Sequence, residues 1–279
     1  MGVRADIGVI GGTGFYALAE GMREVPVATP YGEPSDPVAL GTLAGREVAF
    51  LPRHGRDHRF PAHAVNFRAN IWALRSLGVR QILAPAAVGS LRPELGPGTI
   101  VVPDQIVDRT SGRAQTFYDS GAVHVSFADP YCAVGRAAVL AAGAPGESAG
   151  GAGESVSGAG GAVDGGTMVV VQGPRFSTRA ESAWFAAQGW SLVNMTGHPE
   201  AVLARELGLC YTAIALVTDL DAGVDAASAV RQEDVFAQFA RGIDRLRALV
   251  GTALDRLPVT RDCACAHALD GMTLPFELP

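Results

Sequence analysis

The stretch IGVIGGTGFYALAE, residues 7–20, joins an apolar run to a glycine-rich turn. The apolar run predicts a buried strand, and the turn places backbone N–H groups at the carboxyl end of that strand. The spacing Gly12-x-Gly14-x-x-Ala17 also fits the fingerprint of a dinucleotide-binding turn. The first question is whether this turn holds a pyrophosphate or something smaller.

The residues after the turn lack the context that a dinucleotide site needs. Such a site requires a crossover helix, a second strand, and an acid near the end of that strand for the ribose. Here only YALAEGM separates the turn from a polar segment, and Glu33 lies in the predicted turn YGEPSD. The dinucleotide interpretation is therefore disfavoured. The alternatives to it are a tight turn without a ligand and a smaller anion site, to which Thr13 offers a hydroxyl and an N–H.

Strands and helices alternate over most of the remaining chain. Apolar residues on both sides of AGR predict a β-hairpin over residues 37–55, and helical spacing predicts a helix over residues 66–79. Further strands are expected in QILAPAAVGSL, GTIVVPDQIVD, TMVVVQGPRF and YTAIALVTDLD, and further helices in HPEAVLARELGL and over residues 233–256. This order predicts an α/β fold in a single domain, residues 1–279, with helices on both faces of one sheet.

Residues 143–166 interrupt this order with a Gly/Ala/Ser-rich segment of low complexity. Such a composition cannot bury enough apolar area to form a core of its own. We therefore expect a surface insert within one domain, not a boundary between two domains.

The composition excludes several functional classes. The chain has 279 residues, a net charge of −6 and no lysine, so all 22 basic residues are arginine. The absence of lysine excludes Schiff-base enzymes, P-loop kinases and protein kinases. The negative charge argues against a nucleic-acid partner. With no apolar run of membrane-spanning length and no secretion signal, we expect a cytoplasmic protein without a membrane partner.

Cysteines are few for a chain of this length, which fits a reducing compartment. They are Cys132, Cys210, Cys263 and Cys265. Their spacing contains no zinc-type pair of cysteine pairs, so no metal site is expected. The Cys263-Ala264-Cys265 segment is open to two interpretations, packing or a weak redox pair.

Polar residues gather after the predicted strands, where ligand crevices open in α/β proteins. PRHGRDHRFPAH, residues 52–63, brings Arg53 and His54 to a strand end. NMTGHPE, residues 194–200, places Thr196 before a predicted helix, a position that suits phosphate. Arginines at strand ends are also commonly solvated, so each residue alone is a weak indication.

Two acids follow the last apolar run, in VTDLD. Asp219 and Asp221 lie at i and i+2, so their side chains share one face of the strand. Acids at a strand end can also be solvated loop residues or helix caps. Phe176, in GPRFSTRAES, could line the same site or belong to the core.

Seven blocks in one order resemble the methylthioadenosine phosphorylase branch of the trimeric purine nucleoside phosphorylases. They run from about residue 7 to about residue 250: GVIGGTG, RHGRDH, VNFRANIWALRSLG, VGSL, DQIVDRTSGRAQTFYD, GTMVVVQGPRFSTRAES and VNMTGHPEAVLARELGLCYTAIALVTDLD. The resemblance implies a mixed, twisted central sheet flanked by helices, and a homotrimer without a metal or organic cofactor. It also implies that inorganic phosphate splits a 5′-modified purine nucleoside into a free base and a ribose 1-phosphate.

The resemblance also implies site residues, position by position. Those for phosphate are Thr13, Arg53, His54, the backbone of Ala86 and Ala87, and Thr196. Those for the base and ribose are Phe176, Ser177, Met195, Asp219 and Asp221, and those near the 5′ substituent are His124, Gln232 and Val235. Ala86 departs from the threonine often found at its position, so it offers an N–H and no hydroxyl.

The chemistry of such a cleavage requires an acid beside the base and an anion below the ribose. The leaving purine needs a proton at N7, and positive charge develops on the ribose. Asp219 is the candidate acid, because burial and the like charge of Asp221 would raise its pKa. A 6-amino base offers an N–H donor at position 6 and an acceptor at N7. An ionised carboxyl can accept from the first and a protonated carboxyl can donate to the second, so the two acids indicate adenine.

The 5′ substituent is less constrained. An apolar residue is usual where Gln232 stands, and this suits a methylthio group, whereas glutamine could donate to a hydroxyl or a halogen. We expect 5′-methylthioadenosine, with 5′-deoxyadenosine, a 5′-halo analogue, adenosine or a 6-oxopurine nucleoside as alternatives. A nucleoside-binding protein without catalysis also fits the same residues.

Overall fold

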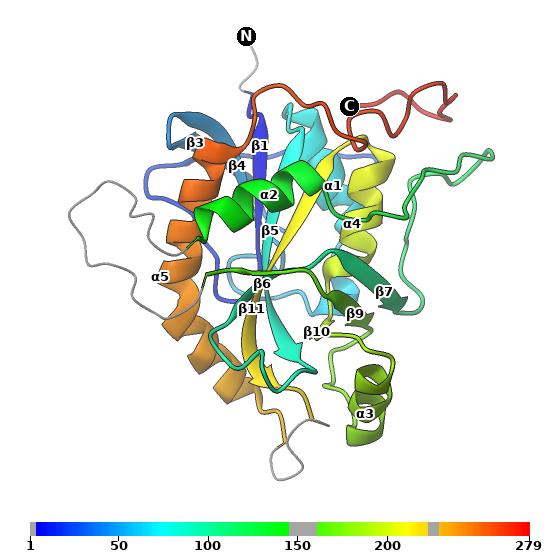
Figure 1. The fold of residues 1–279 in the computed structure, drawn as a ribbon. Coiled ribbons are helices and arrows are strands. Elements are labelled where there is room, and N and C mark those ends of the chain that lie inside the picture. Colours follow the sequence, from blue (N-terminus) through cyan, green and yellow to red (C-terminus); the bar gives the residue numbers. More distant parts are fainter. Residues whose placement is uncertain (1–3, 145–160, 223–228) are drawn as a thin grey trace.

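The computed structural model describes residues 4–144, 161–222 and 229–279, and these form one mixed sheet between two helical layers (Figure 1). The strands are β1 (Ile7–Gly11), β2 (Arg23–Val25), β3 (Val38–Leu43), β4 (Arg46–Pro52), β5 (Gln81–Ser90), β6 (Ile100–Val102), β7 (Gln105–Arg109), β8 (Val163–Asp164), β9 (Thr167–Val171), β10 (Leu192–Asn194) and β11 (Cys210–Leu220). The helices are α1 (Phe67–Ser76), α2 (Ala133–Ala142), α3 (Arg179–Ala187), α4 (Gly197–Glu206) and α5 (Gln232–Arg256), with a 3₁₀ turn at Ala62–Ala64. The prediction of an α/β fold with a mixed central sheet is confirmed.

β5 is the central strand and has three strand partners. β11 runs parallel to it along its whole length. On the other edge, β1 pairs with residues 81–83 and β10 pairs with residues 89–90, in opposite directions. Between these two partners, residues 84–88 face a gap in the sheet. This gap contains the predicted phosphate-binding residues Ala86 and Ala87.

Apolar helix faces cover both sides of the sheet. α2 and α5 pack on one side through residues such as Val139, Leu246 and Val250. α1 and α4 pack on the other side through residues such as Ile71 and Leu203. The view in Figure 1 shows α5 running along the sheet, with the C-terminal segment crossing the end at which β11 begins.

The hairpin, the helix over residues 66–79 and the long final helix are confirmed as β3–β4, α1 and α5. The single strand expected in GTIVVPDQIVD is wrong. It is two strands, β6 and β7, which end and begin on either side of Pro103 and Asp104. Proline has no N–H for a ladder, so the chain leaves β11 after β6 and joins β9 as β7.

The boundaries expected for the Gly/Ala/Ser-rich insert are too wide. Gly143 caps α2, and residues 163–164 form β8, which pairs in parallel with β6. The central part of the insert, residues 145–160, lies outside the described residues. Within the described ranges, no helix has the length and apolar character needed to cross a membrane.

Candidate active site

A cavity of about 340 Å³ opens where β1, β4, β5, β10 and β11 end and α5 begins. Predicted site residues from seven separate segments meet there. Those that line the cavity are Thr13, Arg53, His54, Ala86, Ala87, Phe176, Ser177, Met195, Thr196, Asp219, Asp221, Gln232 and Val235. Strand ends distant in sequence therefore converge as the α/β arrangement predicts.

His124 is the predicted site residue that the structure does not bring to the cavity. It lies exposed in the segment between β7 and α2 and is not among the residues that line the cavity. His124 therefore does not reach the cavity of its own chain, and its place beside the 5′ substituent stays a prediction. The resemblance assigns a role to His124, but it does not say whether this residue contacts a substrate in its own subunit or in a neighbouring one.

Neighbouring protein groups pack directly against the backbone of the glycine-rich turn, where a side chain would collide with them. A Cβ at Gly12 would lie 2.9 Å from the Pro85 carbonyl oxygen and 3.0 Å from a terminal nitrogen of Arg53. Gly14 has a φ of +76°, and a Cβ there would meet the Phe239 ring at 2.7 Å. No crossover helix follows the turn, so the dinucleotide interpretation is excluded. Both glycines let the turn approach the cavity wall closely, with Thr13 facing the cavity.

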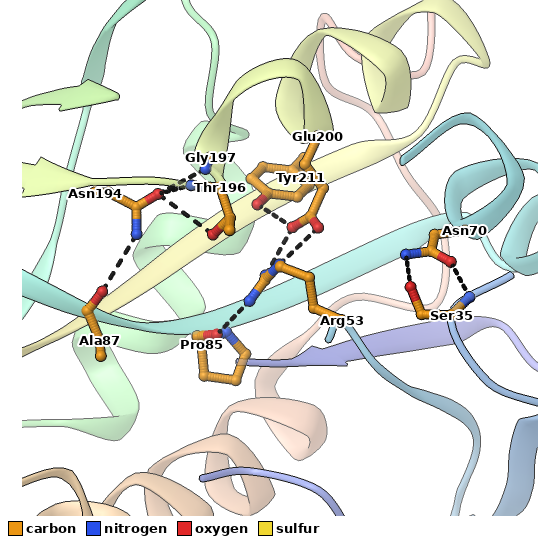
Figure 2. A network of polar contacts seen from close by, with 10 residues as sticks. All are labelled: Ser35, Arg53, Asn70, Pro85, Ala87, Asn194, Thr196, Gly197, Glu200 and Tyr211. Atoms are coloured by element: carbon orange, nitrogen blue, oxygen red, sulfur yellow. Dashed lines mark hydrogen bonds and ion pairs between the residues drawn. The ribbon is translucent and has the colours of Figure 1, made fainter. Parts of the chain in front are cut away.

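Arg53 is fully buried and held by Glu200 from α4 (Figure 2). Its Nε and one terminal nitrogen donate to the two carboxylate oxygens at 2.7 Å each, and its other terminal nitrogen donates to the Pro85 carbonyl at 3.3 Å. Tyr211 also donates to Glu200, at 2.7 Å. A guanidinium has five N–H donors, so some remain for a ligand, but its charge is already balanced by the carboxylate.

His54 is a neutral acceptor at the cavity wall. Burial and the neighbouring Arg53 lower its pKa to about 3. Its Nδ1 lies 2.8 Å from the Phe60 carbonyl, which can only accept, so Nδ1 carries the proton and Nε2 has a free lone pair. The ring stacks on His58, 4.5 Å away between centroids, and His58 also lines the cavity. With Arg53 balanced and His54 neutral, this wall offers hydrogen bonds without net positive charge.

Asn194 fixes the turn between the end of β10 and the start of α4, in which Thr196 lies. Its carboxamide oxygen accepts from the N–H groups of Thr196 at 2.8 Å and Gly197 at 2.6 Å, and its nitrogen donates to the Ala87 carbonyl at 3.3 Å (Figure 2). The same oxygen accepts from the Thr196 hydroxyl at 3.4 Å. Asn194 therefore orients Thr196, which lines the cavity directly before α4, and the role of Thr196 in phosphate binding stays a prediction.

The two acids stand together at the far end of β11, as predicted. A Cβ at Gly89 would lie 3.1 Å from Asp219 Oδ1 and 3.4 Å from Asp221 Cβ, so both side chains lie over the same point of β5. Asp221 is buried and its Oδ2 lies 2.5 Å from the Ser182 hydroxyl of α3. Burial, reinforced by the charge of Asp221, raises the pKa of Asp219 to about 6 against the opposing hydrogen bond from Thr218.

Other cavity groups are positioned by residues that the sequence does not single out. Arg113, from the segment after β7, donates to the carbonyls of Met195 at 2.9 Å and Gln172 at 2.8 Å, so it fixes the segments that carry Met195 and Phe176. Phe176 is half-buried at the cavity and is not a core residue. The Ser177 hydroxyl is buried with no hydrogen-bond partner among the described residues, which leaves it for a ligand.

Sequence reasoning missed Asn194, Glu200 and Arg113. His58 belongs to the Arg/His-rich motif that the sequence places at a strand end. The other three act through contacts across the fold, for which no local signal exists. Among the described residues, the one group of side chains suited to a metal lies away from this cavity. It consists of the four cysteine sulfurs, all within 4.8 Å of one another.

Comparisons with known proteins identify the family. The phosphorylase superfamily matches residues 6–255. The chain is 60% identical to S-methyl-5′-thioadenosine phosphorylase of Mycolicibacterium smegmatis, covering 98% of this chain and 99% of that one. It is 56% identical to purine nucleoside phosphorylase of Streptomyces coelicolor, over 99% of each chain.

A solved structure shares the fold closely. Methylthioadenosine phosphorylase from Schistosoma mansoni in complex with adenine superposes with a TM-score of 0.82 at 38% identity, covering 90% of this chain and 91% of that one. The family match, the two curated relatives and this structure all extend over nearly the whole chain. The chain therefore belongs to the phosphorylase superfamily, in its methylthioadenosine phosphorylase branch.

Proposed function

We propose that this chain cleaves 5′-methylthioadenosine with inorganic phosphate, giving adenine and 5-methylthioribose 1-phosphate. The observation that carries the proposal is one cavity with anion-binding groups on one wall and two adjacent carboxyl groups on another. A nucleoside bound between them would have its ribose facing phosphate and its base facing Asp219. The relatives' names and the adenine in the Schistosoma enzyme support the same substrate class.

The phosphate wall supplies donors and one acceptor. We assign to phosphate the Thr13 and Thr196 hydroxyls, the remaining N–H groups of Arg53, and the Ala87 N–H, which points to the same edge of β5 as its carbonyl. His54 Nε2 would accept from a phosphate hydroxyl. Phosphate held in line below the ribose is both the nucleophile and the counter-charge to the developing oxocarbenium ion.

The base wall supplies the proton. Protonated Asp219 would donate to N7 of the leaving adenine, and a pKa near 6 keeps part of the population protonated at neutral pH. Asp221 is tied to Ser182 and would hold its carboxylate toward the 6-amino side. Ser177 would complete the base contacts and Phe176 would pack on the purine face.

At the 5′ end, Val235 and Gln232 from the first turn of α5 line the cavity. We propose a homotrimer in which His124, exposed on its own chain, contacts the 5′ substituent bound by a neighbouring copy. We place the reaction in the cytoplasm, in purine and methionine salvage. The reaction as proposed uses phosphate as its co-substrate and no metal or organic cofactor.

The test is adenine release with and without phosphate, over a panel of 5′-methylthio, 5′-deoxy, 5′-halo and 5′-hydroxy adenosines. Release that requires phosphate and is most efficient with 5′-methylthioadenosine is the expected result. Release without phosphate would make the protein a hydrolase, and binding without release would make it a nucleoside-binding protein. Including the 6-oxo analogues tests the alternative that the name of the Streptomyces relative suggests.

A further inference from the structure

The four cysteines of the chain meet at the end of β11 opposite to the acids. Cys210 is the first residue of β11, and Cys132 directly precedes α2. Cys263 and Cys265 lie in the C-terminal segment, which crosses this end of the sheet in Figure 1. Three of the four side chains are buried and Cys263 is partly buried. The group thus joins three segments that are far apart in sequence.

The sulfur positions fit a tetrahedron around one ion. A zinc–sulfur bond of about 2.3 Å gives sulfur–sulfur edges of about 3.8 Å in a tetrahedron. The Cys132–Cys263 and Cys210–Cys263 sulfur distances are 3.8 and 3.3 Å, and all four atoms lie within 4.8 Å of one another. A disulfide needs about 2.05 Å between its two sulfurs, and all four thiols are free in this structure.

The surroundings of the cysteines suit bound thiolates. Arg205 places a guanidinium nitrogen 3.6 Å from the sulfur of Cys265, and Arg261 places one 3.7 Å from the sulfur of Cys210. Both arginines are fixed by backbone carbonyls, Arg205 by Ser126 and Asp129, and Arg261 by Gly208. Four thiolates around a divalent ion leave two negative charges, and these two cations lie where they would offset them.

We propose that Cys132, Cys210, Cys263 and Cys265 bind one zinc ion in a closed tetrahedral site. Each thiol loses its proton on binding, and the four thiolates fill the coordination sphere, so the ion has no open position for a substrate. Soft thiolate ligands favour zinc over magnesium or calcium. The site would fasten the C-terminal segment to the start of β11 and to α2. It revises the expectation of no metal, which rested on the spacing of the cysteines along the chain.

The primary test uses the full-length protein without a metal-binding tag, produced with zinc in the medium and purified under reductant. Elemental analysis should find one zinc per chain, and intact mass should show four reduced cysteines after denaturation. Replacing zinc with cobalt should give the strong visible bands of tetrahedral cobalt thiolate. A protein without zinc, whether its thiols are free or joined in disulfides, would overturn the proposal.

Two variants locate the site. Cys263→Ser removes the least buried ligand and should lose the zinc. His267→Ala is the matched control, because His267 is exposed beside Asp262 and Asp270 in the same segment and could hold adventitious zinc. The control should keep one zinc per chain. Loss of zinc from the His267 variant, or its retention in the Cys263 variant, would overturn the assignment.

A third measurement does not depend on whether the serine variant folds. A strong chelator added to the wild-type protein should remove the zinc, make all four thiols reactive and lower Tm, and added zinc should reverse all three changes. Four thiols that react at the same rate with and without chelator would contradict the site. These readouts are metal content, thiol reactivity and Tm, so they succeed or fail independently of the proposed phosphorolysis.

Discussion

The two ends of β11 carry different chemistry within one strand. At its carboxyl end, Asp219 and Asp221 face a cavity and are close to groups that a ligand can reach. At its amino end, Cys210 lies with Cys132 and Cys265 in a buried cluster against which the partly buried Cys263 packs. The first end concentrates groups with hydrogen-bonding capacity left for a substrate, whereas the second gathers four thiols that we assign to a structural ion. The difference implies that changes at the carboxylate end alter activity and that changes at the cysteine end alter stability.

The largest expected effect is at the carboxylate end. Asp219→Asn keeps the side-chain shape and removes the acid, so kcat/KM for 5′-methylthioadenosine should fall by about 10²–10⁴-fold. The amide gains a donor toward O6, so 5′-methylthioinosine should lose less. The measurement is kcat/KM for both nucleosides in wild type and variant. An equal fall would mean that Asp219 protonates the base without selecting it, and no change would remove it from the mechanism.

Arg53→Ala should have the next largest effect. Loss of charge-assisted hydrogen bonds worth about 1.5–3 kcal/mol should raise the apparent KM for phosphate about 10- to 100-fold. The variant also leaves Glu200 buried without its partner, so Tm should fall as well. Arg56→Ala is the control from the same motif, since Arg56 pairs with Asp36 and Glu24 outside the cavity. An unchanged phosphate KM in the Arg53 variant would make this arginine purely structural.

The two ends of β11 also differ in how far the sequence predicts them. Many cavity residues follow individual strands, and their local motifs point to strand ends, where ligand sites open in α/β proteins. Cys132 and Cys210 carry no local signal, because only the packing of α2 and of the C-terminal segment on β11 brings the sulfurs together. Glu200 is similar: α4 is predictable, but its salt bridge to Arg53 depends on α4 packing against the end of β4.

Two other limits have distinct causes. The division of the β6–β7 region follows from Pro103, whose missing N–H is visible in the sequence but whose effect depends on the neighbouring strands. The position of His124 depends on the path of the segment between β7 and α2, on which His124 is exposed. Local patterns therefore predict the helices and strands and most of the cavity wall. Contacts between residues distant in sequence determine that Glu200 balances the charge of Arg53 and that the four cysteines cluster.

The raised pKa of Asp219 gives a stability test of the carboxylate end. The folded protein holds this proton up to about pH 6, whereas the unfolded chain loses it near pH 3.8. The contribution of this group to stability is therefore present below pH 3.8 and is lost as pH rises through about 6. Asp219→Asn should be more stable than wild type at pH 7 by about 1–3 kcal/mol, with the gain shrinking toward pH 4. Denaturant unfolding of both proteins at several pH values measures the difference in their free energies of unfolding. A difference that does not change with pH would contradict the assigned pKa of Asp219.

At the cysteine end, Gly135→Ala should change stability without changing catalysis. A Cβ there would lie 2.0 Å from the Thr212 hydroxyl, so the Thr212 side chain or the start of α2 must shift. Overpacking of this kind costs about 1–3 kcal/mol, and kcat/KM of the folded fraction should be unchanged. Gly251→Ala in α5 meets nothing within 4 Å and should instead stabilise by about 0.5–1 kcal/mol. A fall in kcat/KM for the Gly135 variant would show that the two ends of β11 are coupled.

The smallest expected effect concerns the 5′ substituent, at the edge of the carboxylate end. Gln232 is the first residue of α5 and is exposed at the cavity mouth, so its amide can reach a 5′-hydroxyl but remains solvated without one. A solvated hydrogen bond is worth about 0.5–1.5 kcal/mol, so Gln232→Leu should shift the kcat/KM ratio of 5′-methylthioadenosine to adenosine by about 2- to 13-fold toward the methylthio substrate. The shift should come mainly from poorer use of adenosine, because leucine leaves the hydroxyl without a partner, and Tm should be unchanged. A ratio that moves toward adenosine would mean that the glutamine amide contacts the sulfur side of the pocket, and the assignment of this residue would then be reversed.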